Sequence, residues 1–436
     1  MEPATLSLVV AALIIIPLLA AGVHIGPTLG LAGVVGSIVF TGSWSAGFGL
    51  PLIQSLDVAS SYTLMVIPLF IAMGTIAGHT GITSDLFAAF YRWIGRVPGG
   101  IAVATIGTCA GMASITGSSL AVSAAMSKIA LPELRRYRYD DSLSLGSIAM
   151  GGTVAIMIPP SITLVLFAIF AEQSVGQMLI AGVLPGLSTA LLYILLIIGR
   201  CWLTPALGPA GPRFSWRDRW ASMPSVIPFF AVVLAIILGI LFGVWTPTES
   251  AAVGLLVVLA LGVARRRLTW SVLFAALVDA VLISASVMMV VIGSLIFGNF
   301  IALNGFSQIL TDWIVALDLQ PFVLFAVLFL VYLVLGTMME ATSILALTVP
   351  LVLPIVYHVG WHPVWFGVVL VSLMEVAAVT PPVGLNLFMV KAAVPEVQLS
   401  TIYLGSAPFW CMNFLVIFGL YQWPQIALYL PLLMIQ

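Results

Sequence analysis

Long apolar segments follow one another along most of this chain and are separated by short polar stretches. A helix needs about 20 mostly apolar residues to cross the hydrocarbon core of a bilayer. The segments that meet or approach this requirement are 6–23, 29–40, 62–77, 179–198, 226–244, 251–263, 276–299 and 402–420. The pattern therefore predicts an all-α polytopic membrane protein. Segment 43–60 is less apolar, carries Asp57, and is predicted to be a loop.

Two shorter segments, 84–95 and 307–317, have apolar positions at helical spacing with charged or polar residues between them. This spacing predicts amphipathic helices. Segment 84–95 either lies at the membrane interface or forms the end of the following span.

Two apolar segments, about 99–130 and about 321–357, are interrupted in the middle by polar and small residues. The interrupting residues are Gly117, Ser118 and Ser119 in the first segment and Thr337, Glu340, Thr342 and Ser343 in the second. Each arm of the first segment has roughly 11 to 15 residues, which is short for a span. Basic residues flank both of its ends. We therefore predict two re-entrant helical hairpins, which enter the membrane and return to the same side.

Two further apolar segments, 143–171 and 363–391, each contain a Pro-Pro pair, at Pro159 and at Pro381. Proline removes a backbone donor and clashes with the preceding turn, so both helices are predicted to be broken there. Irregular backbone at membrane depth survives only where protein surrounds it or where it lines a wet cavity.

These interruptions recur at a nearly constant distance along the chain. The Pro-Pro pairs are 222 residues apart (381 − 159), and the hydroxyl pairs that begin at Ser118 and Thr342 are 224 apart (342 − 118). Gly81 and Gly305, which precede the two amphipathic segments, are also 224 apart (305 − 81). The chain therefore contains a two-fold internal repeat. Matched interrupted segments in two halves indicate the binding site of a transporter.

The composition agrees with a membrane protein. Of the 436 residues, 62% are hydrophobic and 7% are charged, whereas a soluble domain is about 25% charged. The net charge of −1 gives no basis for a nucleic-acid partner. The three cysteines lie far apart and are expected to be buried hydrophobes. The first apolar segment lacks a basic start and is expected to be a retained span, not a signal peptide.

The basic residues predict how the chain is oriented. When the spans are threaded alternately with the N-terminus outside, all 14 Lys and Arg residues fall inside or near that face. The expected location is a bacterial inner membrane with a periplasmic N-terminus. In this threading the two hairpins open from opposite sides, so the repeat is inverted, an arrangement that supports alternating access about a midplane site.

The expected organisation has five parts. Scaffold helices occupy 1–61. The first inverted repeat spans 62–200, with its hairpin at about 99–130 and its broken helix at 143–171. A cytoplasmic basic loop and linking spans occupy 201–280. The second repeat spans 281–425, with its hairpin at about 321–357 and its broken helix at 363–391, and a C-terminal tail occupies 426–436.

Interrupted helices leave unpaired carbonyl and N–H groups, which suit a cation and an anion respectively. Two Na⁺ sites are predicted, with no other metal and no cofactor. The first uses Gly117, Ser118, Ser119, Gly152 and Pro159, and the second uses Thr337, Thr342, Ser343, Thr380 and Pro381. Ser161, Glu340 and Asn386 are candidates for orienting substrate or coupling ions.

A purely structural role is the alternative for each of these residues. A single hydroxyl in a membrane helix often bonds only its own i−4 carbonyl. Glu340 is either a protonatable group or a helix cap. For Glu375 three roles are open: a conformational role, a hydrogen-bonded structural role, and a role in ion coupling. The repetition at a matched offset favours function for the clusters as a whole.

Several motifs together resemble those of a known family. They are Thr116-Gly-Ser-Ser-Leu-Ala121, Leu131-Pro-Glu-Leu134, Ile158-Pro-Pro-Ser-Ile162, Trp245-Thr-Pro-Thr-Glu-Ser-Ala-Ala-Val253, Met338-Met-Glu-Ala-Thr-Ser343 and Val379-Thr-Pro-Pro-Val-Gly-Leu-Asn-Leu-Phe388. Over nearly its whole length the chain resembles the large membrane subunit of TRAP (tripartite ATP-independent periplasmic) transporters.

The resemblance implies a sodium-coupled secondary importer of organic acids, such as C4-dicarboxylates or sialic acid, with an elevator-type transport domain. It also implies a small four-helix membrane subunit and a periplasmic substrate-binding protein as partners. The family's sodium sites fall at the hairpin tips and Pro-Pro breaks. The chain departs from the family at Glu340-Ala341-Thr342, where Asp-Pro-Thr is frequent, and at Arg138-Tyr139, where Gly-Tyr is frequent.

Three other functions are weighed against this one. A self-sufficient Na⁺- or H⁺-coupled carboxylate carrier would share the hairpins and breaks but would need no binding protein. An intramembrane enzyme would need convergent acid, base or metal groups, and the candidate membrane-depth acids Glu340, Glu375 and Asp279 have no histidine nearby in sequence. A scaffold protein does not explain the inverted repeat. We therefore expect a transporter and not an enzyme.

Overall fold

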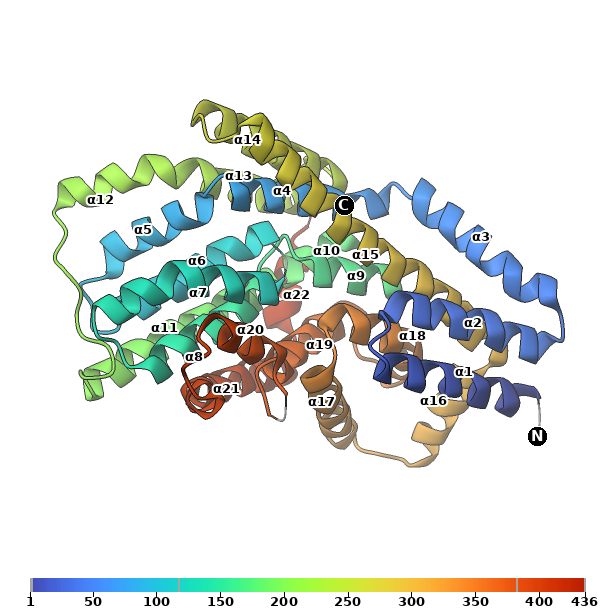
Figure 1. Ribbon diagram of the computed structural model, residues 1–436. Helices are drawn as coiled ribbons and strands as arrows, with labels where there is room; N and C mark the ends of the chain where they lie inside the picture. The colour runs from blue at the N-terminus through green and yellow to red at the C-terminus, as the bar shows by residue number, and fades with distance from the viewer. Residues whose placement is uncertain (1–2, 117, 382, 435–436) are drawn as a thin grey trace.

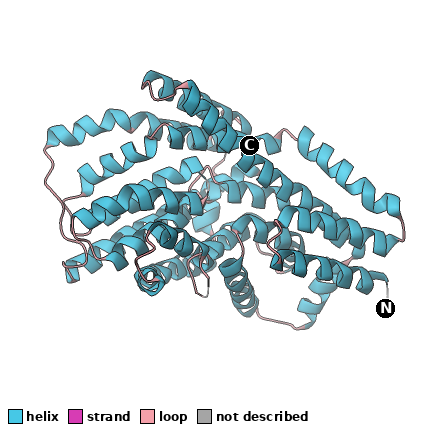
Figure 2. Cartoon of the chain, in the orientation of Figure 1, coloured by secondary structure: helices cyan, strands magenta, loops and turns pink. Residues whose placement is uncertain are grey.

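The regular elements of the protein are helices throughout the described part of the chain. The computed structural model describes residues 3–116, 118–381 and 383–434 (Figure 2). The helices of the first half are α1 (Pro3–Ala20), α2 (Ile25–Thr41), α3 (Trp44–Ser60), η1 (Thr63–Met65), α4 (Val66–His79), α5 (Ile82–Ile94), α6 (Gly100–Thr116), α7 (Ser119–Arg136), α8 (Asp141–Met157), α9 (Ile162–Phe170), α10 (Val175–Ala181) and α11 (Val183–Leu203). Those of the second half are α12 (Trp216–Ser222), η2 (Met223–Ser225), α13 (Ile227–Leu241), α14 (Pro247–Ala264), α15 (Trp270–Asn304), α16 (Phe306–Ala316), α17 (Pro321–Met338), α18 (Ala341–His358), α19 (Pro363–Ala377), α20 (Leu385–Ala393), α21 (Leu399–Gln422) and α22 (Gln425–Leu432).

The helices are long and apolar enough for a multi-pass membrane protein, as the hydrophobic pattern predicted. Within the described ranges, seven helices meet the length and hydropathy expected of a span, or up to ten if each of three bent pairs counts as one span. Two of these pairs are α3 with η1 and α4, bent by 69°, and α8 with α9, bent by 44°.

The internal repeat is visible in the order of the helices. In the first copy, α4 is followed by Gly81, α5, the pair α6 and α7, and the broken pair α8 and α9. In the second copy, α15 is followed by Gly305, α16, the pair α17 and α18, and the broken pair α19 and α20. Gly81 and Gly305 both adopt the left-handed conformation, with φ of 75° and 74°, which glycine adopts at no steric cost. The two amphipathic segments form helices α5 and α16.

The prediction that segment 43–60 is a loop is wrong. The segment forms the 17-residue helix α3, which contains Pro51 and packs against α2 and α15. Tertiary packing overrides the weak helical signal of this segment.

Two groups of helices lie at opposite ends of the molecule. Helices α6, α7, α8, α11, α20 and α21 gather on the left in Figure 1, whereas α1, α2, α3 and α16 lie on the right. The first halves of the two broken helices are deeply buried, since every residue is buried from Leu143 to Met157 of α8 and from Val364 to Ala377 of α19. A helix that is apolar on all sides belongs inside other protein.

Helices α2 and α15 approach each other backbone to backbone through glycines. A methyl group added at Gly293 would lie 2.0 Å from the carbonyl oxygen of Gly26. One added at Gly26 would lie 2.6 Å from the carbonyl oxygen of Met289. This contact therefore leaves no room for any side chain at either glycine.

Candidate functional site

The first hairpin has its tip between α6, which ends at Thr116, and α7, which begins at Ser119. Ser118 is the N-cap of α7 and accepts a hydrogen bond from the backbone N–H of Ala121 at 3.4 Å. A capping serine satisfies one of the otherwise free N–H groups of the first turn. Gly117, which was predicted to bind Na⁺ here, lies outside the described residues.

The first broken helix runs beside this tip. Its second half, α9, is capped by Ser161, which is fully buried and accepts from the N–H of Leu164 at 3.3 Å. Gly152 of α8 faces α7 closely, because a methyl group added there would lie 2.1 Å from Ser123 Oγ and 2.8 Å from the carbonyl oxygen of Ser119. The tip and the broken helix are therefore in direct contact at Gly152.

The second hairpin has its tip between Met338, the end of α17, and Ala341, the start of α18. Glu340 occupies the N-cap of α18, but its side chain makes no cap hydrogen bond. The predicted cap role of Glu340 is therefore absent in this conformation. Thr337 is buried and donates to the carbonyl of Val334 at 2.8 Å, as a hydroxyl within a helix commonly does.

The second break is wider than the first. Helix α19 ends at Ala377 and α20 begins at Leu385, after Gly384 in the left-handed conformation with φ of 67°. The backbone N–H of Asn386 donates to the carbonyl of Ala378 at 3.0 Å, which joins the two half-helices. The Asn386 side chain is fully buried, and neither its nitrogen nor its oxygen has a hydrogen-bond partner among the described residues. Thr380 donates to the carbonyl of Val376 at 2.6 Å.

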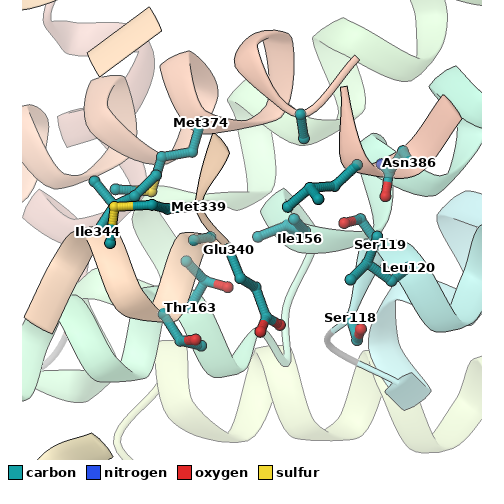
Figure 3. A pocket seen from close by; sticks show the side chains of 14 residues that line it. Ser118, Ser119, Leu120, Ile156, Thr163, Met339, Glu340, Ile344, Met374 and Asn386 are labelled. Atoms are coloured by element: carbon teal, nitrogen blue, oxygen red, sulfur yellow. The ribbon is translucent and has the colours of Figure 1, made fainter. Parts of the chain in front are cut away.

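A small cavity of about 40 Å³ connects both tips with both breaks (Figure 3). Glu340 and Thr163 lie on one side of it, and Ser118, Ser119 and Asn386 lie on the other. The remaining lining residues are Leu120, Ile156, Met339, Ala341, Thr342, Ile344, Met374, Ala378 and Leu385. Residues more than 260 positions apart in sequence, from Ser118 to Asn386, thus share one cavity.

The electrostatics of this cavity follow from the helix ends around it. Helices α6, α8, α17 and α19 end at the four interruptions, and α7, α9, α18 and α20 begin there. Carbonyl groups without intrahelical partners carry partial negative charge at the ends, and free N–H groups carry partial positive charge at the starts. Together with the hydroxyls of Ser118, Ser119 and Thr342, the arrangement can bind a hard cation and a carboxylate close together.

A larger cavity of about 930 Å³ adjoins the small one and shares Ser118, Glu340 and Thr342 with it. It continues along α7 past Lys128 and is bounded by α4 and α15. At its wall, the His79 ring lies 2.8 Å from the Asp279 carboxylate and joins α4 to α15.

Some of the predicted site residues line the small cavity, and the others do not. Ser118, Ser119, Glu340, Thr342 and Asn386 line the small cavity. The other described candidates, which are Gly152, Pro159, Ser161, Thr337, Ser343, Thr380 and Pro381, are in the tips and broken segments but do not line it.

Sequence reasoning did not place four residues that line these cavities. Thr163 lies in the first turn of α9, directly after the break. A hydroxyl at that position could have been predicted to line the site. Lys128 and the His79–Asp279 pair line the larger cavity. Nothing local in the sequence indicates that His79 and Asp279 meet, because 200 residues separate them.

Comparisons with known proteins agree on one family. Residues 12–426 match the family model described as tripartite ATP-independent periplasmic transporter, DctM component. The C4-dicarboxylate TRAP transporter large permease protein DctM of Pseudomonas aeruginosa is 31% identical over 409 residues, which cover 93% of this chain and 93% of that protein. The sialic acid TRAP transporter large permease protein SiaM of Vibrio cholerae is 29% identical over 389 residues, covering 89% of this chain and 90% of the relative.

Two further comparisons bear on length and fold. The isethionate TRAP transporter permease protein DctMQ of Oleidesulfovibrio alaskensis is 32% identical over 386 residues, covering 85% of this chain but 58% of that longer protein. The crystal structure of the Alcanivorax borkumensis YdaH transporter, described as having an unusual topology, aligns with a TM-score of 0.57 and 13% identity over 99% of this chain and 98% of that one. This second likeness shows the fold alone.

The matched family covers nearly the whole chain, and its curated members are transporter permeases, not enzymes. The motifs that suggested the family, at the two tips and two breaks, all lie within the matched residues. The chain belongs to the DctM component family of tripartite ATP-independent periplasmic transporters, as a large permease subunit in the membrane.

Proposed function

We propose that this chain is the large membrane subunit of a sodium-coupled importer of organic acids. The observation that carries the proposal is the cavity where both hairpin tips and both helix breaks meet. Relatives named for C4-dicarboxylate and sialic acid support a carboxylate as the transported compound. Helix N-termini at the same place favour a carboxylate, and helix C-termini favour Na⁺.

The sizes of the two cavities support separate roles. A water molecule needs about 10–15 Å³, so the cavity of about 40 Å³ has room for an ion and its remaining water but not for an organic acid. The adjoining cavity of about 930 Å³ has ample room for a small organic acid. Substrate in the larger cavity would face the shared residues Ser118, Glu340 and Thr342.

Two Na⁺ sites are proposed, one at each tip. The first comprises Gly117, Ser118, Ser119, Gly152 and Pro159, and the second comprises Thr337, Thr342, Ser343, Thr380 and Pro381. Support for the first comes from the contact between Gly152 and the Ser119 carbonyl. In the second, Thr337 and Thr380 already donate to helix carbonyls, so each hydroxyl oxygen keeps its lone pairs for a cation.

Glu340, Ser161 and Asn386 are proposed to act on substrate or coupling. Glu340 and Asn386 line the cavity, and the unpartnered amide of Asn386 can both donate and accept there. Ser161 holds the start of α9 through its cap hydrogen bond.

Two partners are proposed: a small four-helix membrane subunit and a periplasmic substrate-binding protein. The tripartite family description supports both. The isethionate relative, with its double designation DctMQ and its greater length, supports a second membrane component. The placement of the 14 basic residues supports an inner-membrane protein with a periplasmic N-terminus, re-entrant hairpins and elevator-like movement.

The test is uptake of radiolabelled organic acids into proteoliposomes under an inward Na⁺ gradient. The chain is reconstituted alone, with the small subunit, and with both partners. Uptake that requires all three components and Na⁺ is the expected result. Uptake by the chain alone would assign it to self-sufficient carboxylate carriers instead. If a folded preparation takes up no acid of the panel in any combination, the proposed function is wrong.

The second Na⁺ site has its own test in the same assay. Replacing Thr342 and Ser343 together by alanine should raise the Na⁺ concentration for half-maximal uptake. An unchanged Na⁺ dependence would remove these hydroxyls from the site.

A further inference from the structure

Glu375 is a carboxylic acid buried in the centre of α19. It is 0% exposed, and neither carboxyl oxygen has a hydrogen-bond partner among the described residues. Most buried polar groups in proteins are paired, so an unpartnered buried carboxyl group calls for an explanation. The function proposed above makes no use of this residue.

One polar side chain of another helix lies near the carboxyl group, and two more lie beside that side chain. Tyr193 of α11 lies close enough to Glu375 to interact electrostatically, and the Tyr193 hydroxyl lies beside Thr153 of α8 and Asn413 of α21. All four residues are at most 1% exposed. The hydroxyl of Tyr193 and the amide nitrogen of Asn413 also lack hydrogen-bond partners in the described structure. Near Glu375, the Tyr193 hydroxyl is therefore a donor without a geometric hydrogen-bond partner among the described residues.

Among the described residues, no lysine or arginine on a helix that packs against α19 compensates for a charge at Glu375. The helices that pack against α19 are α8, α9, α10, α17, α18, α21 and α22, and none of them contains a lysine or an arginine. Asp141 is at the first position of α8, and His358 is at the last position of α18. On α11, Arg200 is seven residues beyond Tyr193, about 10 Å along the helix.

The other titratable groups on these helices are engaged elsewhere or exposed. Tyr332 donates to Thr348 at 3.0 Å, and Tyr403 donates to the carbonyl of Val383 at 2.6 Å. Tyr421 packs its ring against Phe325. The remaining ones, Tyr357, Cys411 and Tyr429, are exposed.

An ionised carboxylate in such surroundings is strongly disfavoured, because burial removes its hydration and no lysine or arginine on the neighbouring helices compensates for the charge. Intramembrane acids of this kind commonly belong to proton or ion pathways. A neutral acid is compatible with the surroundings, since it carries no charge, offers one O–H donor and keeps an oxygen that can accept a hydrogen bond.

We propose that Glu375 is a proton-binding site of the transporter, loaded in this conformation and exchanging its proton with the small cavity. Met374 and Ala378, on either side of Glu375 in α19, both line that cavity. On loading, a proton from water in the cavity forms an O–H bond with one carboxylate oxygen, and release reverses this step. The inference rests on the proposed transport function and adds H⁺ to the ions that the chain binds.

The first test uses the purified chain and does not depend on transport. The infrared carbonyl band of a protonated carboxyl group is recorded across a pH series, in H₂O and in D₂O. We expect a band that shifts on deuteration, diminishes at alkaline pH, and is missing from Glu375→Gln. Asp57→Asn, which removes an exposed acid of α3, is the matched control and should keep the band.

The second test measures uptake into proteoliposomes holding the complete transporter, with the Na⁺ gradient fixed and the pH gradient varied. One proton carried with each substrate changes the accumulation ratio up to about tenfold per pH unit. We expect wild type to respond to the pH gradient and Glu375→Gln to be insensitive to it while still taking up substrate.

The outcomes separate this inference from the proposed function. Na⁺-driven uptake with no response to pH, or a carboxyl band that never exchanges or titrates, would overturn the proton site and leave the transport function intact. If Glu375→Gln fails to fold, the titration is recorded on Glu340→Gln, which removes the acid that lines the small cavity; a titrating band that persists there supports Glu375, and loss of the band overturns the inference. Absence of uptake together with a titrating, exchanging band would support the proton site and count against the sodium-coupled importer.

Discussion

Replacing Gly152 by alanine tests whether the first hairpin tip depends on its contact with α8. The added methyl group would lie 2.1 Å from Ser123 Oγ and 2.8 Å from the carbonyl oxygen of Ser119. The serine hydroxyl can rotate away, but a backbone carbonyl cannot. To restore an ordinary contact of 3.4 Å, the Ser119 carbonyl must withdraw by about 0.6 Å, the difference between 3.4 and 2.8 Å.

This displacement is large on the scale of ion binding. Ligand distances in metal sites hold within about 0.2 Å, so a shift of 0.6 Å removes the carbonyl as a ligand or distorts the tip that carries Ser118. Loss of supporting contacts around an ion site typically costs 10–100-fold in affinity. Overpacking costs about 1–3 kcal/mol, and the glycine-to-alanine change in a helix returns about 0.5–1, which leaves a net loss of about 0.5–2 kcal/mol.

The assay is Na⁺ titration of uptake in proteoliposomes, with thermal unfolding of the same preparation. Gly152→Ala should raise the half-saturating Na⁺ concentration at least about tenfold and lower Tm modestly. Gly199→Ala in α11 is the control, because nothing lies within 4 Å of the added methyl group. It should leave the Na⁺ dependence unchanged and keep or raise Tm. If both variants behave like wild type, the contact at Gly152 does not position the ion site.

Three further variants test other parts of the structure. Ser118→Ala combined with Ser119→Ala should raise the Na⁺ requirement of uptake, since it removes two hydroxyls from the cavity; the same Na⁺ curve as wild type would exclude the first site. Pro381→Ala should let α19 extend into the break and slow uptake at equal protein level; wild-type rates would mean that the break is not needed. Asp85→Asn should destabilise the fold by about 1–3 kcal/mol in thermal or denaturant unfolding. The change removes the negative charge that pairs with Arg265, at 3.2 Å, and with Arg267, at 2.7 Å, and replaces one of the two carboxylate oxygens by a donor. Unchanged stability would contradict this prediction.

Two controls make these results specific. Pro51→Ala changes a proline inside α3, away from both breaks, and should leave uptake unchanged. Asp57→Asn changes an exposed acid on the same helix and should leave stability unchanged.

Much of the fold was predictable because membrane sequences carry strong local signals. Interrupted apolar segments predicted the pairs around Ser118 and Glu340, and proline predicted the breaks at 159 and 381. The matched Gly81 and Gly305 predicted equivalent positions in the two copies of the repeat, and both adopt the same left-handed backbone conformation. These features depend on backbone chemistry within a few residues, so no tertiary information was needed.

The remaining features depend on packing between distant segments. The sequence of α3, with Pro51 and Asp57, predicts a loop. The segment forms a helix because it packs against α2 and α15. His79 and Asp279 pair across 200 residues, and only the fold brings them together. For Glu375, sequence indicated an acid at membrane depth, but the absence of a cation around it among the described residues is a property of seven neighbouring helices.

The glycine contact between α2 and α15 has a mechanical consequence. Sliding α2 by one helical turn, about 5.4 Å, would bring Met289 or Phe297 opposite Gly26 in place of Gly293. Neither side chain fits where even a methyl group would lie 2.0 Å from backbone. The two helices are therefore locked in register at a single depth. In the elevator-like movement proposed above, the tips would therefore have to move relative to this fixed pair, because the two helices cannot slide past each other.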